Sequence, residues 1–126
     1  MKIYTDAGSR GNPGKSACAF IVVKDNKIIQ EKAKYLGIKT NNEAEYNAII
    51  LALENTEEDA ELTSDSELVI KQINREYKIT KPHLKELNNQ VQELIKNRKI
   101  IFKNASRENK FISRADELVN LELDRH

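Results

Sequence analysis

The sequence contains a single cysteine, two prolines, four glycines and two histidines among its 126 residues. One cysteine, Cys18, excludes an internal disulfide and any metal cluster that needs several cysteine ligands. No apolar run approaches the roughly 20 residues of a membrane span. The first residues also lack the long apolar segment of a signal peptide, so we expect a cytoplasmic protein without a membrane partner.

The charge balance is also nearly even, with a net charge of +1. This balance neither demands nor excludes a nucleic-acid partner, because local patches matter more than the sum. Hydrophobic residues make up 39% of the chain and charged residues 33%, which is typical of a globular protein. The length suits one core, and no repeat or composition shift marks a linker, so we expect one domain over residues 1–126.

The apolar periodicity predicts an alternation of strands and helices after an initial hairpin. Strands are expected at residues 1–6, 16–24, 28–36, 60–63 and 99–105, with Gly37 ending the third. Helices are expected at residues 43–55, 66–74, 82–95 and 112–123, the first capped by Thr40–Asn42. A hairpin followed by alternating strands and helices predicts a mixed sheet with helices packed on it.

Three of the four glycines lie in residues 5–14, TDAGSRGNPG, and Lys15 and Ser16 follow directly. The ending GKS suggests a nucleotide-binding P-loop. That motif needs a glycine five positions before its last glycine, where Ser9 stands, and it must open a helix. The segment after Ser16, ACAFIVV, is instead typical of a strand. The P-loop is therefore excluded, and the glycines favour a tight turn.

Four acidic residues occupy unusual places in this pattern. Asp6 and Asp65 each end a predicted strand, at the edge where open α/β folds place their ligand sites. Glu45 and Asp116 lie on helical faces that are otherwise apolar, where an unpaired carboxylate is costly. Any one of them alone is most simply a cap or a surface ion pair. Four on separate elements suit a hard cation, Mg²⁺ or Mn²⁺, and two such ions about 4 Å apart can promote phosphodiester cleavage.

Four segments resemble the type 1 ribonuclease H family, in its compact bacterial and archaeal form. They are TDAGSRGNPG, TNNEAEYNAIILALE, SDSELVIKQI and SRADELVN, and they occur in the family's order along nearly the whole chain. The resemblance implies an α/β, RNase H-like fold with a five-stranded mixed sheet flanked by helices. Its first three strands are expected to be antiparallel and its last two parallel.

The resemblance also implies an activity. The expected enzyme is a monomeric endonuclease that hydrolyses the RNA strand of RNA–DNA hybrids with two Mg²⁺ ions, for which Mn²⁺ substitutes. It leaves 5′-phosphate and 3′-hydroxyl ends. The family's metal-binding and catalytic carboxylates fall on Asp6, Glu45, Asp65 and Asp116. Substrate contacts are expected at Gly8, Ser9, Asn12, Thr40, Asn41, Asn42, Arg107 and Asn109. A basic cluster is a candidate for DNA-strand contacts: Lys71, Arg75, Lys78 and Lys81.

The sequence departs from the family's pattern at three places. Ile112 falls where the resemblance implies an asparagine, and Asn109 is the candidate to replace it. Ala7 stands where a glycine is usual. The loop before the last helix carries Arg107 where many members have a histidine. Arginine stays protonated and cannot act as a base, but it can hold a phosphate with two hydrogen bonds.

Two other functions fit the same residues. One is a module of this fold that binds hybrids or partners without cleaving them. The other is a nuclease that acts on other duplexes, such as double-stranded RNA, which also offers 2′-hydroxyl groups, or DNA. The four acids favour catalysis over a binding module.

Overall fold

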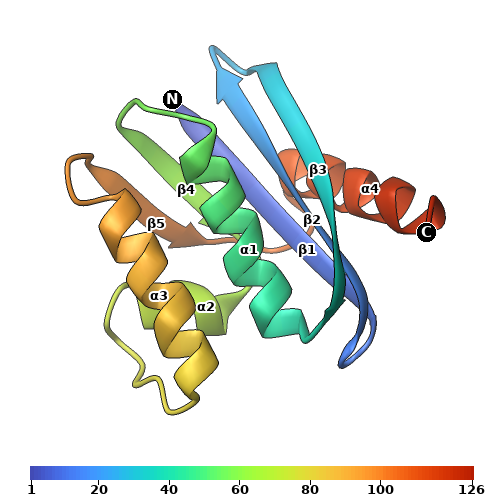
Figure 1. Ribbon diagram of the computed structural model, residues 1–126. Coiled ribbons are helices and arrows are strands. Elements are labelled where there is room, and N and C mark those ends of the chain that lie inside the picture. Colours follow the sequence, from blue (N-terminus) through green and yellow to red (C-terminus); the bar gives the residue numbers. More distant parts are fainter.

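The computed structural model describes residues 1–126, and it contains the predicted alternation of strands and helices (Figure 1). The strands are β1 (Lys2–Gly11), β2 (Gly14–Lys24), β3 (Lys27–Lys39), β4 (Ala60–Ser64) and β5 (Ile100–Asn104). The helices are α1 (Asn41–Glu54), α2 (Glu67–Ile73), α3 (Pro82–Leu94) and α4 (Lys110–Asp124). None of these helices is of a length and hydropathy that would span a bilayer.

The strands form one five-stranded sheet in the order β3-β2-β1-β4-β5. Strand β2 pairs antiparallel with both β1 and β3, whereas β4 pairs parallel with both β1 and β5. The predicted mixed sheet is thereby confirmed. Strand β1 lies at its centre, where the antiparallel and parallel parts meet.

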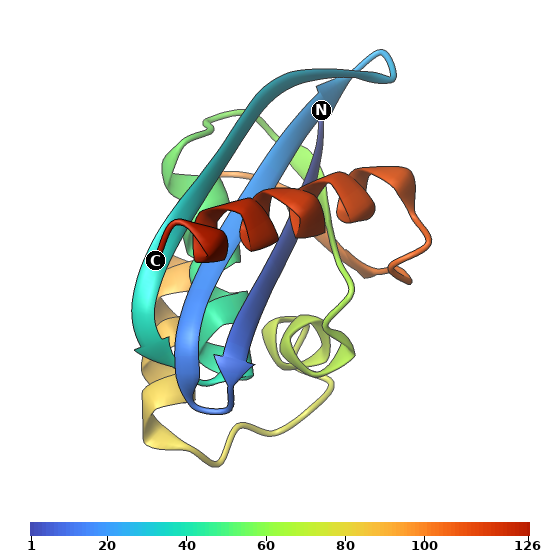
Figure 2. The ribbon, with the colours of Figure 1, turned by 90° about the vertical axis from the view of Figure 1, so that its right-hand side faces the viewer.

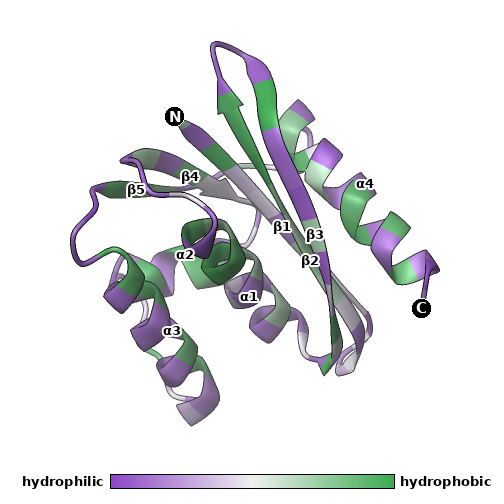
Figure 3. Cartoon of the chain, turned by 45° about the horizontal axis from the view of Figure 1, so that its top comes forward, coloured by the Kyte–Doolittle hydropathy of each residue, from purple (hydrophilic) through white to green (hydrophobic).

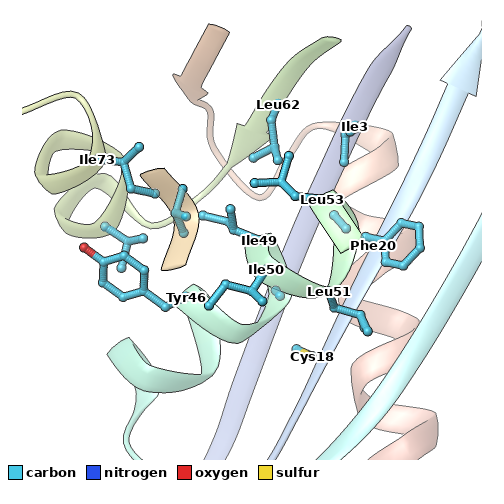
Figure 4. Close-up of a cluster of buried hydrophobic side chains, with 14 of the residues drawn as sticks. Ile3, Cys18, Phe20, Tyr46, Ile49, Ile50, Leu51, Leu53, Leu62 and Ile73 are labelled. Atoms are coloured by element: carbon cyan, nitrogen blue, oxygen red, sulfur yellow. The ribbon is translucent and has the colours of Figure 1, made fainter. Parts of the chain in front are cut away.

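Helices cover both faces of the sheet, and two cores result. Helices α1 and α3 pack with α2 on one face, and α4 crosses the other face over β1, β2 and β3 (Figures 1 and 2). Strand β2 contributes to both cores because its side chains alternate: Cys18 and Phe20 face α1, and Ala19 and Ile21 face α4. This explains its continuous apolar run. Figure 4 shows the α1 side, where Phe20 lies among the isoleucines and leucines, and Figure 3 shows apolar residues concentrated toward the packed surfaces.

Two strands are longer than the sequence predicts. Strand β1 does not end at Asp6 but continues through the glycine segment, because Ala7–Gly11 pairs with residues of β2 down to Gly14. The turn is therefore confined to Gly11–Gly14. Strand β3 does not end at Gly37. That glycine has φ +77° at a register shift between β2 and β3, so it forms a bulge inside the strand.

Gly14 closes the β1–β2 turn at a position that has no room for a side chain. A Cβ there would collide with the main chain of Arg10. We therefore expect Gly14→Ala to lower the free energy of unfolding by about 1–3 kcal/mol, as forced overpacking does, measured by urea denaturation. Gly8→Ala is the matched control, since its Cβ would only touch a Val119 methyl group at 3.4 Å. Equal stability of the two variants would contradict this explanation.

Candidate active site

The register of the central strands places two of the predicted acids side by side. The last parallel pair between β1 and β4 joins Thr5 to Ser64, so Asp6 is the next residue of β1 and Asp65 the first residue after β4. Asp6 still pairs with Ala19 of β2 on its other side. It therefore stands inside a strand, at the point where pairing with β4 stops and the two neighbours separate.

Helix α1 supplies the third acid. The helix begins with a capping box, in which the Thr40 hydroxyl accepts the Glu43 N–H and the Glu43 carboxylate accepts the Thr40 N–H. Glu45 follows in the second turn on the face that packs against the sheet and is 8% exposed. The Ser64 hydroxyl, at the end of β4, donates to Glu45 Oε2 at 3.5 Å. The apolar stripe of the sequence thus predicted the burial of this carboxylate correctly.

Three carboxylates converge as a result. One oxygen from each of Asp6, Glu45 and Asp65 lies within 4.8 Å of the others. Asp116, on α4, lines the same cleft of about 590 Å³ as Glu45 and Asp65. The four acids therefore come from β1, α1, the end of β4 and α4, and they meet at one place in the fold.

The buried acids have no protein partners for much of their hydrogen-bonding capacity. Both carboxylate oxygens of Asp6 and Oε1 of Glu45 are the buried side-chain atoms that lack a hydrogen bond. Other buried polar side chains are paired: the Tyr46 hydroxyl donates to Gln72 at 2.8 Å and accepts from Asn88 at 3.3 Å. Unpaired buried carboxylates are costly, so their concentration at one cleft indicates a site kept for a ligand.

The electrostatics of the cluster favour a positively charged ligand. Burial, followed by the negative charges of Asp65 and Asp116, raises the pKa of Asp6 to about 8. Burial and the charges of Asp6 and Asp65 raise the pKa of Glu45 well above its usual value. A divalent cation would remove this repulsion and provide a partner for each unpaired oxygen. Because all the donors are carboxylate oxygens, they fit a hard cation such as Mg²⁺ or Mn²⁺.

Some residues of the glycine segment line the cleft, and others hold the β1–β2 turn against the neighbouring elements. Gly8 and Ser9 line the cleft. The Ser9 hydroxyl also donates to the Lys39 carbonyl at 2.7 Å and contacts the Ser16 hydroxyl, so it ties β1 to the end of β3. Asn12, in the turn, accepts the Asn41 N–H at 3.1 Å. Its side chain thus holds the turn against the start of α1.

Two main-chain N–H groups at the start of α1 are already hydrogen-bonded within the protein. Asn41 and Asn42 line the cleft. The Thr40 N–H donates to the Glu43 carboxylate, and the Asn41 N–H donates to the Asn12 side chain. The capping box and the neighbouring turn thus occupy these two groups, and the substrate contacts expected at Thr40 and Asn41 stay a prediction.

The loop between β5 and α4 brings one of its two candidate residues to the acids. Arg107 lines the cleft, and its Nε donates to Asp65 Oδ2 at 2.7 Å. Asn109 is the N-cap of α4, and its side chain accepts the N–H groups of Phe111 and Ile112. Its oxygen is therefore used to start the helix that carries Asp116.

The basic cluster expected to contact DNA lies at the end of α2 and in the connector to α3. None of its residues, Lys71, Arg75, Lys78 and Lys81, lines the cleft. Lys71 pairs with Glu67 at 3.0 Å and lies 5.0 Å from the centre of the exposed Tyr77 ring.

The structure adds three polar cleft residues that sequence reasoning did not single out: Arg10, Ser66 and Asn120. Ser66 caps α2 directly after Asp65, and this position next to a predicted acid was the available signal. Arg10 extends from the part of β1 that was predicted to be a turn. Asn120 lies one helical turn after Asp116, a spacing that becomes informative only once the orientation of α4 is known.

A mixed five-stranded sheet with clustered acids at the splayed ends of its central strands defines the class of RNase H-like folds. The comparisons with known proteins agree. The sequence profile of the RNase H family matches residues 1–116, and this chain belongs to that family. It is 39% identical over 97 residues to Ribonuclease HI of Halobacterium salinarum, an alignment that covers 73% of this chain and 49% of the relative. The matched region thus spans about half the length of that curated relative.

Solved structures extend the likeness to almost the whole chain. A crystal structure of LC11-RNase H1 in complex with an RNA/DNA hybrid has a TM-score of 0.92 and 36% identity, covering 98% of this chain and 96% of that one. The crystal structure of RNase H1 from Halobacterium salinarum has a TM-score of 0.91 and 35% identity, covering 99% of this chain and 98% of that one.

Proposed function

We propose that this protein is a metal-dependent ribonuclease H that hydrolyses the RNA strand of RNA–DNA hybrids. The observation that carries the proposal is the convergence of Asp6, Glu45 and Asp65, in which both Asp6 oxygens and Oε1 of Glu45 lack protein partners. Two family relationships support it: one relative is named Ribonuclease HI, and one similar structure is of a complex with an RNA/DNA hybrid. A binding module would gain nothing from a buried acidic cluster that destabilises the fold.

The acids would hold two divalent cations, Mg²⁺ or in its place Mn²⁺, with Asp116 completing the set from α4. When bound, such cations supply positive charge beside the scissile phosphate and lower the pKa of water. The chain's own residues fix where this charge collects. Strands β1 and β4 hold Asp6 and Asp65 on adjacent positions, and Ser64 orients Glu45 through its hydroxyl. We propose 5′-phosphate and 3′-hydroxyl products, which attack on the phosphorus with loss of the 3′-oxygen would give.

The walls of the cleft suit an RNA strand. Gly8 brings the main chain of β1 to the cleft surface, and Asn42, Ser66 and Asn120 add short polar side chains. Such groups can hydrogen-bond to 2′-hydroxyls, which distinguish RNA from DNA. The same chemistry permits double-stranded RNA as a second substrate. The DNA strand would lie toward the basic cluster of Lys71, Arg75, Lys78 and Lys81.

One assay separates the candidate functions. Labelled RNA–DNA, RNA–RNA and DNA–DNA duplexes are incubated with the protein in Mg²⁺, in Mn²⁺ and in EDTA. We expect cleavage of the RNA strand of the hybrid in either metal and none in EDTA. Binding of the hybrid without cleavage in any metal would favour the non-catalytic module. Faster cleavage of RNA–RNA would assign the protein to the alternative nuclease.

The remaining expectations are part of the same proposal. All four acids come from one chain, which supports a monomer that is active as a single domain. The cytoplasmic location stays a prediction. Sedimentation of the protein with and without hybrid would test the monomer.

A further inference from the structure

Arg107 is the one cationic side chain that touches the acidic cluster. Its Nε lies 2.7 Å from Asp65 Oδ2, and no other ion pair in the structure involves Asp6, Glu45, Asp65 or Asp116. The Arg107 side chain is 73% exposed, whereas the Asp65 side chain is only 10% exposed. The arginine therefore reaches from a solvent-exposed loop onto an acid that is nearly enclosed.

The charge of Arg107 acts on the whole cluster. Its pKa is raised by the hydrogen bond and charge of Asp65, and further by the charges of Asp6 and Asp116. Arg107 in turn lowers the pKa of Glu45 against the larger effect of burial. One guanidinium thus partly neutralises all four acids, as a bound cation would. The other arginine in the cleft, Arg10, pairs instead with Asp124 at 2.6 Å.

We propose that Arg107 is a tethered counter-ion that competes with the divalent cation for Asp65 and is displaced when the cation binds. The inference rests on the proposed function, because it assumes that the acids bind a metal. The physical reason is that an N–H donor and a cation cannot share the same side of Asp65 Oδ2, and that their positive charges repel. Asp65 is the only hydrogen-bond partner of the Arg107 side chain, so this side chain can move away from Asp65 without breaking another hydrogen bond.

This competition has a consequence for the order of binding. Metal binding releases a guanidinium at the rim of the cleft, where it can hold a phosphodiester with two hydrogen bonds. Arg107 therefore weakens the affinity for the metal and strengthens the affinity for the substrate only after the metal is present.

Magnesium titrations followed by NMR test the competition without any substrate. Isotope-labelled wild-type, Arg107→Gln and Arg114→Gln proteins are freed of metal with EDTA, exchanged into EDTA-free buffer at alkaline pH and titrated with MgCl₂. Arg114 is the matched control, since it loses the same charge on the neighbouring helix but pairs with Glu31, outside the cleft. We expect Arg107→Gln to bind Mg²⁺ about threefold to tenfold more tightly than wild type, and Arg114→Gln to bind like wild type. The difference should shrink in high salt, because Arg107 is exposed.

The wild-type spectra give a second readout. Amide signals of the loop at residues 105–109 should shift together with those beside Asp65, because Arg107 leaves as Mg²⁺ enters. Equal or weaker Mg²⁺ binding by Arg107→Gln, with Mg²⁺ still bound by wild type, would overturn the competition and leave the proposed function standing. If no variant shows Mg²⁺-dependent shifts in the cleft, the proposed function fails and this inference with it.

Discussion

Replacing Asp65 with Asn is expected to abolish cleavage of an RNA–DNA hybrid at saturating Mg²⁺. Asp65 follows the last residue of β4, and one of its carboxylate oxygens lies within 4.8 Å of an oxygen of Asp6 and of Glu45. Its negative charge is therefore central to the cluster. An amide of the same shape keeps the packing but removes a charged cation ligand. Because metal ions contribute several kcal/mol to such reactions, we expect kcat to fall by about 10³-fold or more.

The control for this variant is Asp25→Asn. Asp25 lies in the exposed turn between β2 and β3, with φ 51°, a conformation that asparagine also adopts readily. The same chemical change there should leave kcat and KM unchanged. Gel analysis of labelled hybrid in excess over the protein measures kcat and KM of both variants, and circular dichroism checks that they are folded. Cleavage by Asp65→Asn at the wild-type rate would contradict the metal site.

Asp6→Asn is expected to stabilise the protein in EDTA, most strongly at pH 8. Asp6 is 1% exposed and its pKa is raised to about 8, mainly by burial, so the folded protein holds a proton that the unfolded chain releases. Between the ordinary aspartate value, about 4, and pH 8, the folded state thus binds more protons than the unfolded state. Its free energy of unfolding must then fall as the pH rises.

The free energy of unfolding is expected to fall by several kcal/mol between about pH 4 and pH 8, since each unit of pKa shift corresponds to about 1.4 kcal/mol. Urea denaturation in EDTA at intervals from pH 5 to pH 8 measures this decrease in the free energy of unfolding. The wild type and Asp25→Asn should lose stability over this range, and Asp6→Asn should lose much less. Added Mg²⁺ should restore the wild type at pH 8 and have little effect on Asp6→Asn. A wild-type free energy of unfolding that rises from pH 5 to pH 8 would contradict the raised pKa of Asp6.

The sequence predicted the elements well because their signals are local. Thr40 and Glu43 mark the start of α1, Pro82 marks the start of α3, and the apolar run of β2 predicted a buried strand. The ends of β1 and β3 were missed because the length of a strand depends on the neighbouring strand with which it pairs. The glycine segment has weak strand propensity, but β2 supplies a ladder for it up to Gly14.

The candidate site was predicted to a similar extent. Asp6 and Asp65 could be assigned to the same edge of a sheet, and Glu45 to a buried face, from spacing alone. The roles of the polar residues around them could not. Asn12 and Asn109 look alike in the sequence, yet one fastens a turn to α1 and the other caps α4. These hydrogen bonds depend on which main-chain groups happen to lie within reach.

By itself, the sequence determined the order of strands and helices and the identity of the four acids, because hydrophobic spacing, caps and motif residues are properties of short segments. Only the tertiary structure decided that three carboxylates meet within 4.8 Å and that both Asp6 oxygens and Oε1 of Glu45 go unpaired. It also decided that Arg107, which lies 42 positions from Asp65, is the cation that reaches them. Charge repulsion and competition between cations depend on distance in space, and this distance is set by the packing of β1, β4, α1 and α4 together.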